Sequence, residues 1–126
     1  MQKVLLVGFG GFLGSILRYL SVEIIGRLMG GKMMWIATFS VNSVGCLVIG
    51  FLGGLAMTTS YISPSIRLFI LVGLLGGFTT YSTFGYEAQS LVRERELVIA
   101  ALYVGAHLVV GIGFAWFGFS LASSVR

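Results

Sequence analysis

Four long apolar segments dominate this sequence and limit what it can fold into. They cover about residues 4–29, 34–57, 65–92 and 97–122. Each is long enough to cross the roughly 30 Å hydrocarbon core of a bilayer, which takes about 20 helical residues. The connections, such as "GRLMGGKM" and "RERE", are short. The sequence therefore predicts a single all-α membrane domain over residues 1–126, with four transmembrane helices.

The composition supports a lipid environment. Of the 126 residues, 57% are hydrophobic and 10% charged, and a soluble domain of this size cannot cover so much apolar side chain. The start, "MQKVLLVGFGGFLGS", imitates a signal peptide, but its apolar character continues past Ser15, which favours a first membrane helix. The net charge of +4 is spread over loops and helix ends. We therefore expect membrane lipid, and no nucleic acid, as a partner.

The charged residues give almost no preferred orientation. Four helices place both termini on one side, and the positive-inside rule orients the chain by its imbalance of Lys and Arg. One side carries Lys3, Arg67 and Arg126, and the other carries Arg27, Lys32, Arg93 and Arg95. This balance allows either a weakly signalled single orientation or insertion both ways, which would permit an antiparallel homodimer.

Small residues recur at a spacing of four within the segments. The pairs are Gly10 and Gly14, Gly50 and Gly54, and Gly73 and Gly77. This spacing lets helix backbones approach closely in a membrane. It predicts helix packing and identifies no function.

The third segment contains residues that weaken a helix, because "GLLGGFTTYSTFGYE" places Gly76 and Gly77 just ahead of a cluster of hydroxyl residues. Glycine and β-branched threonine both weaken a helix. The sequence predicts a break near Gly76–Thr80. Non-helical backbone at membrane depth is tolerated where protein or a water-filled cavity satisfies it, and the freed carbonyls could hold a monovalent cation.

Polar side chains within apolar segments are the best guide to a site, because they are costly in lipid and usually face protein or water. They are Thr38 and Asn42 in the second segment, Thr79, Thr80, Tyr81, Ser82 and Thr83 in the third, and Tyr103 and His107 in the fourth. Each alone could serve as interhelical packing or bond its own backbone. Together they predict a wet or ion-lined path.

The chemistry of this path suits a small anion. Glu23 and Glu87 fall toward helix ends, so a carboxylate proton relay has no obvious carrier at mid-depth. Uncharged donors near a cation favour anion passage. Arg18 is the candidate cation, although it could equally snorkel to the interface. The rings of Tyr81 and Phe84 could present positive edges to an anion, with ordinary packing as the alternative.

Three motifs resemble one known family. "GGFTTYSTF" at residues 76–84, "VNSVG" at 41–45 and "GGFLGSILRY" at 10–19 are similar to the Fluc, or CrcB, family of fluoride channels. The resemblance covers essentially the whole chain. It implies a passive channel that exports cytoplasmic fluoride across the bacterial inner membrane and so gives fluoride resistance. It also implies an antiparallel, dual-topology homodimer with two pores.

The resemblance implies roles for individual residues. A structural sodium ion (Na+) would lie at the dimer centre, held by the backbone carbonyls of Gly76 and Thr79 from both subunits. Asn42 and Phe84 would line the pore, and Arg18 would lie near its vestibule. The other residues along or near the pore would be Thr38, Thr80, Tyr81, Ser82, Thr83, Tyr103 and His107.

The chain departs from the family pattern at two positions. The first pore aromatic is usually Phe, and here it is Tyr81, whose hydroxyl could donate to the ion or to a neighbour. A small hydroxyl residue often follows the position of His107 by one turn, and here that residue is Gly111. We therefore expect this part of the polar row to rely on water or on another side chain.

Two other functions compete with a channel. A small multidrug-type exporter also has four helices and dual topology, but it needs a mid-depth carboxylate on the first helix, where Glu23 is the only candidate. A non-transporting membrane assembly subunit would need neither ion flux nor Asn42. We expect no enzyme, because the sequence offers no nucleophile–base pair and no metal-ligand cluster beyond His107 and Cys46.

Overall fold

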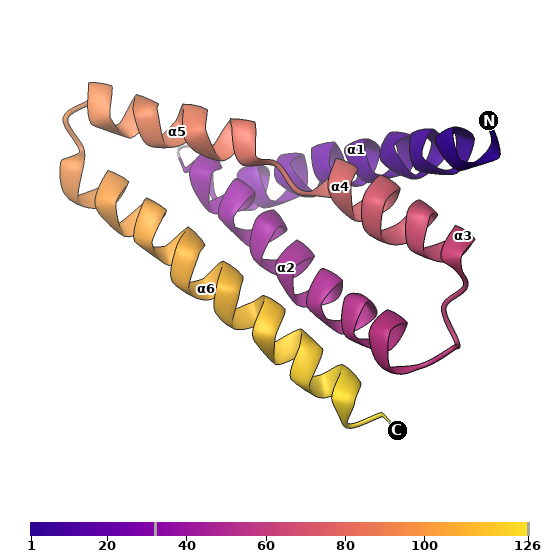
Figure 1. Ribbon diagram of the computed structural model, residues 1–126. Helices are drawn as coiled ribbons and strands as arrows, with labels where there is room; N and C mark the ends of the chain where they lie inside the picture. The colour runs from indigo at the N-terminus through magenta and orange to yellow at the C-terminus, as the bar shows by residue number, and fades with distance from the viewer. Residues whose placement is uncertain (32, 126) are drawn as a thin grey trace.

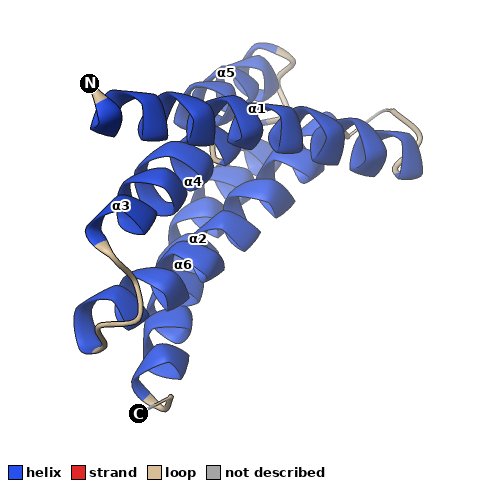
Figure 2. Cartoon of the chain, turned by 90° about the vertical axis from the view of Figure 1, so that its right-hand side faces the viewer, coloured by secondary structure: helices blue, strands red, loops and turns tan. Residues whose placement is uncertain are grey.

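The computed structural model describes residues 1–31 and 33–125, and every regular element within them is a helix (Figures 1 and 2). Four helical spans are long and apolar enough to cross a membrane, at Gln2–Leu28, Met34–Thr58, Pro64–Arg93 and Leu97–Ser123. This confirms the predicted all-α architecture with four membrane helices. The elements are α1 (Gln2–Leu28), α2 (Met34–Thr58), α3 (Pro64–Arg67), η1 (Leu68–Leu74), α4 (Leu75–Phe78), α5 (Tyr81–Arg93) and α6 (Leu97–Ser123).

Successive spans run in opposite directions, so both ends of the chain lie at the end of the molecule that carries the α2–α3 loop (Figure 1). Figure 2 views the molecule from this end. Arg67 closes α3 here, whereas Arg27 and Arg93 lie in the last turns of α1 and α5, at the other end. Lys32 and Arg126, which the charge balance also included, lie outside the described residues.

The third span is a composite of four short elements. Ser63 caps its start by accepting a hydrogen bond from the backbone N–H of Ile66 at 3.3 Å, and Pro64 occupies the first helical position, both of which are typical helix starts. The π-helical segment η1 follows α3, and α4 then ends at Phe78. Two extended residues, Thr79 and Thr80, separate α4 from α5.

Glycines lie where two helix pairs touch, as their spacing predicts. A Cβ placed on Gly73 would lie 2.8 Å from the carbonyl oxygen of Val7 and 3.0 Å from the Cα of Gly10, so α1 and η1 approach to backbone contact. On α2, a Cβ at Gly54 would lie 2.7 Å from the Cβ of Ala122 on α6. These contacts explain the paired glycines, because any larger residue would separate the helices.

The interior is small, and the outer surface is apolar. The main buried cluster joins Leu91 of α5 to Ala100 and Tyr103 of α6. Large apolar side chains point outward instead, including Phe12 at 60% and Val109 at 75% exposed. An outer surface of this kind needs lipid or another protein to cover it, which is the arrangement of a multi-pass membrane protein.

Candidate functional site

The site is built around the interruption of the third span. Thr79 (φ −85°, ψ 156°) and Thr80 (φ −146°, ψ 118°) are extended, between the end of α4 and the start of α5. Thr80 caps α5, since its hydroxyl accepts a hydrogen bond from the N–H of Thr83 at 3.2 Å. Threonine favours this position because its side chain satisfies an N–H that lacks a helical partner. The break therefore lies within the interval that the sequence predicts.

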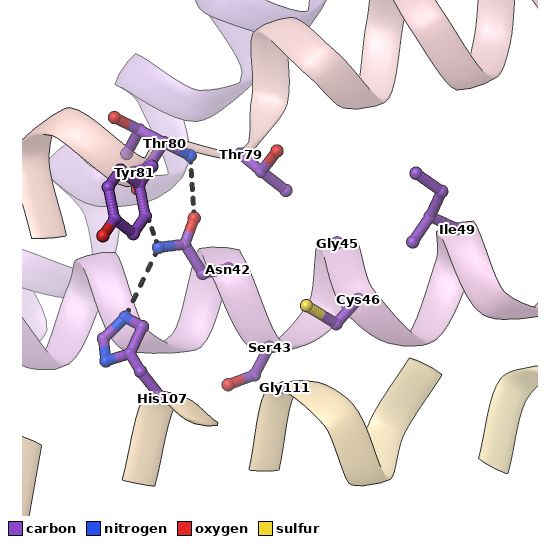
Figure 3. A pocket seen from close by; sticks show the side chains of 10 residues that line it. All are labelled: Asn42, Ser43, Gly45, Cys46, Ile49, Thr79, Thr80, Tyr81, His107 and Gly111. Carbon is purple, nitrogen blue, oxygen red and sulfur yellow. Dashed lines mark hydrogen bonds between the residues drawn. The ribbon is translucent and has the colours of Figure 1, made fainter. Parts of the chain in front are cut away.

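Asn42 of α2 holds the break in place (Figure 3). Its Nδ2 donates to the carbonyl oxygen of Thr80 at 3.0 Å, and its Oδ1 accepts from the N–H of Thr80 at 2.8 Å. One side chain thus satisfies both backbone groups of an extended residue at membrane depth, where unpaired groups are costly. Asn42 is therefore bound to the protein through both heteroatoms of its amide.

These bonds release two carbonyl groups from helical pairing. In a continuous helix each N–H donates to the carbonyl four residues earlier. The N–H of Thr80 would then reach Gly76, but it donates to Asn42. The N–H of Thr83 would reach Thr79, but it donates to the hydroxyl of Thr80. The carbonyls of Gly76 and Thr79 are thereby left without these helical donors.

A cavity of about 320 Å³ lies beside the break, between α2 and α6 (Figure 3). Its lining residues are Asn42, Ser43, Gly45, Cys46, Ile49, Thr79, Thr80, Tyr81, His107 and Gly111. The ring of His107 bonds at both nitrogens: Nδ1 lies 3.1 Å from the carbonyl oxygen of Tyr103, and Nε2 lies 3.4 Å from Nδ2 of Asn42. A carbonyl only accepts, so Nδ1 carries the hydrogen and Nε2 receives the amide donor.

Hydroxyl groups link this cavity to a second one. Thr80 lines the first cavity, and its hydroxyl lies 3.0 Å from that of Thr83 and 3.3 Å from that of Ser82. Thr83 lines a cavity of about 410 Å³ together with Glu87 and Trp35. The predicted cluster of hydroxyl residues therefore connects two hollows through direct contacts, although the Ser82 side chain itself is exposed.

Aromatic rings pack beside His107 and Tyr81 of the first cavity. The centroid of the Phe84 ring lies 4.4 Å from that of His107 and 5.4 Å from that of Tyr103. Tyr81 lies 5.6 Å from Phe84, but it is 85% exposed. Phe84 is therefore packed within the chain, whereas most of the Tyr81 ring is available to another molecule.

The sequence did not predict the hydrogen bonds of Glu87. As expected, it lies toward the end of the third span, Pro64–Arg93, but its carboxylate accepts two hydrogen bonds from other helices. Oε1 receives the hydroxyl of Thr38 at 2.9 Å, and Oε2 receives the hydroxyl of Tyr103 at 2.6 Å. The donors are 1% and 2% exposed. Two features of the sequence point to these bonds. Buried hydroxyls on apolar helices need a hydrogen-bond partner, and Glu87 follows Thr83 by one turn, on the same helix face as the hydroxyl cluster.

Most of the predicted site residues meet in this region, but Arg18 does not. It is half-buried on α1 and lines neither of the two cavities. Thr38 and Tyr103 meet at Glu87 and not at the first cavity. Ser43 and Cys46, which the sequence analysis did not assign to the path, both line the first cavity.

Comparisons with known proteins decide the family. The family model described as CrcB-like protein, Camphor Resistance (CrcB), matches residues 5–119. This chain belongs to the CrcB family. Among its curated relatives, the fluoride-specific ion channel FluC of Methylobacillus flagellatus is 44% identical over 124 residues, covering 96% of this chain and 94% of the relative.

Other CrcB relatives match over a similar length. The fluoride-specific ion channel FluC of Chlorobaculum tepidum is 43% identical, and the match covers 97% of this chain and 95% of the relative. That of Nitratidesulfovibrio vulgaris is 37% identical, covering 94% of each chain. The matches include the break and the helices that line both cavities, so the CrcB assignment applies to the whole site.

Proposed function

We propose that this CrcB protein is a fluoride-selective passive channel that exports fluoride from the cytoplasm. The observation that carries the proposal is the cavity beside the break, which no charged side chain lines and in which the hydroxyls of Ser43 and Tyr81 have no partner among the described residues. Uncharged donors can replace the water around a small anion without holding it too tightly to leave. The relatives named as fluoride-specific channels supply the identity of the anion.

The proposed path runs through the two cavities. Fluoride moves between the cavity at Glu87 and the cavity at Asn42, along the hydroxyls of Thr83 and Thr80, which lie 3.0 Å apart. The Phe84 ring packs against His107, which lines the first cavity, so its rim would lie near the path, and the edge of an aromatic ring carries partial positive charge. Neutral HF enters cells and dissociates at cytoplasmic pH, which traps the fluoride anion inside. The accumulated fluoride can then leave through a channel without an energy source.

The working unit that we propose is an antiparallel homodimer with two pores in the bacterial inner membrane. Tyr81 is 85% exposed beside the cavity, and Gly76 is exposed at the break. A second copy of the chain could pack over these two residues. The nearly equal numbers of positive residues at the two ends permit insertion in both orientations. Tyr81 would then face the pore of the partner subunit.

A structural sodium ion fits the chemistry of the break. The carbonyls of Gly76 and Thr79 lose their helical donors to Asn42 and Thr80, and carbonyl oxygens are suitable ligands for a hard monovalent cation. One subunit offers two such groups, and a second, inverted copy would double them. The ion would supply a fixed positive charge at the dimer centre and would brace the two breaks against each other.

A proton-coupled exporter is the competing function, and Glu87 is the observation that favours it. A carboxylate that accepts from Thr38 and Tyr103 at membrane depth could carry protons. The two functions differ in their need for a gradient. Purified protein in liposomes loaded with potassium fluoride should release fluoride when only a potassium ionophore is added, whereas an exporter would require a proton gradient.

A further inference from the structure

Ser43 faces the first cavity with an unused hydrogen-bond donor. The residue is 8% exposed and lines the cavity together with Asn42 and His107. Across residues 1–31 and 33–125, every side-chain nitrogen or oxygen that is fully shielded has a partner. The Ser43 hydroxyl has none within that part of the chain, so its oxygen must retain access to the cavity. Figure 3 shows it between α2 and α6, beside Gly111.

Two other hydroxyls on α2 do have hydrogen-bond acceptors. Ser40 donates to the carbonyl of Ile36 at 2.8 Å, and Thr58 donates to that of Gly54 at 2.8 Å. Such bonds to the preceding turn are the usual way for serine and threonine to satisfy themselves in a membrane helix. A buried hydroxyl that makes no such bond is costly unless water or a ligand takes its donor. The hydroxyl of Ser43 is therefore available to donate to water or to a ligand in the cavity.

The opposite wall lacks a side chain at this level. Gly111 of α6 lines the cavity, and a Cβ added to it would lie 3.5 Å from Sγ of Cys46, which is an ordinary contact distance. A small residue would therefore fit at position 111 without displacing Cys46. The wall of α6 supplies no hydroxyl there, while α2 supplies one from Ser43.

We propose that Ser43 donates its hydroxyl hydrogen to the fluoride ion in this cavity, and that it replaces a donor that glycine leaves out at position 111. The proposal rests on the proposed fluoride channel function and extends its pore from Asn42 and His107 toward Cys46. No covalent bond changes, because the ion exchanges one water contact for one hydroxyl contact. Ser43 is thus an ion-contacting residue of the pore.

The test compares fluoride release from liposomes for four reconstituted proteins. They are the unmodified protein, Ser43→Ala, the matched control Ser40→Ala, and the double variant Ser43→Ala/Gly111→Ser. Release is started with a potassium ionophore, followed with a fluoride electrode, and normalised to the amount of protein inserted. Alanine is a good helix former, so the substitutions should leave α2 intact. Size-exclusion profiles check that each variant has the same assembly as the unmodified protein.

Loss of a hydrogen bond to a charged group should lower fluoride release by about tenfold in Ser43→Ala. Ser40→Ala should release fluoride at the rate of the unmodified protein, because its hydroxyl serves only its own helix. The double variant should return to within about threefold of the parent, since the new hydroxyl enters the same cavity.

The outcomes separate the two levels of the proposal. If the unmodified protein releases fluoride and Ser43→Ala releases it equally fast, the role of Ser43 is overturned and the channel function stands. A loss in Ser43→Ala that the serine at position 111 does not reverse would indicate a packing role and would also overturn it. If the unmodified protein releases no fluoride, the channel function fails and Ser43 loses its ligand with it.

Discussion

The side-chain amide of Asn42 pairs with both backbone groups of Thr80, donating to its carbonyl at 3.0 Å and accepting from its N–H at 2.8 Å. This reciprocal pair replaces the helical hydrogen bond that the N–H of Thr80 would otherwise make to Gly76. It fixes where the third span opens and which carbonyls become available there. Asn42 therefore shapes the path as well as lining it.

Asn42→Ala should abolish most fluoride release and also weaken the fold. The substitution leaves the N–H of Thr80 without its partner, and an unsatisfied buried group costs about 1–3 kcal/mol. We expect at least a tenfold loss of flux and a lower midpoint of thermal unfolding, with the same assembly in detergent as the unmodified protein. Ser120→Ala is the control, because that hydroxyl bonds only the carbonyl of Trp116. Normal flux in Asn42→Ala would remove this residue from the pore.

Phe84→Ile should reduce fluoride release while leaving the assembly intact. Isoleucine is apolar and keeps much of the packing volume, but it has no ring edge to offer an anion. The matched control is Phe117→Ile, since Phe117 is 50% exposed on α6, whereas Phe84 packs against the cavity-lining His107. Both variants are compared by liposome efflux and size-exclusion chromatography. Equal flux in the two variants would argue against a role for the Phe84 ring.

Tyr103→Phe should lower stability more than its small change in size suggests. The lost hydroxyl donates to Oε2 of Glu87 at 2.6 Å, and hydrogen bonds between membrane helices are worth about 0.6–1.7 kcal/mol. We expect a loss of that size in the free energy of unfolding, measured in mixed micelles. Tyr61→Phe, at a loop residue that is 80% exposed, should change nothing. No loss in Tyr103→Phe would mean that Glu87 is satisfied without it.

An epitope tag at the C-terminus should be reachable from both sides of the membrane. The positive residues at the two ends of the spans are nearly balanced, so insertion should occur in both orientations. Labelling of intact cells and of inverted vesicles with an impermeant reagent measures the two populations. Adding three lysines to one terminus provides the control, because it should drive the tag to a single side. Labelling from one side only in the parent protein would rule out the antiparallel dimer.

The helices and the break could be predicted because they depend on local sequence. Span length follows from bilayer thickness, and the glycine pair before Thr79 and Thr80 weakens the helix within a few residues. The partner of Asn42 could not be predicted in this way, because 38 positions separate it from Thr80 in the chain. The same limit applies to Glu87, which receives Thr38 from α2 and Tyr103 from α6 only after three helices have packed.

The most direct test of the channel compares fluoride with chloride in the same liposomes. Vesicles containing the unmodified protein and loaded with equal potassium fluoride and potassium chloride are diluted into impermeant salt, and a potassium ionophore is added without a proton gradient. The account predicts rapid fluoride release, with chloride release no faster than from protein-free vesicles. Equal release of both anions, or fluoride release only under a proton gradient, would contradict it.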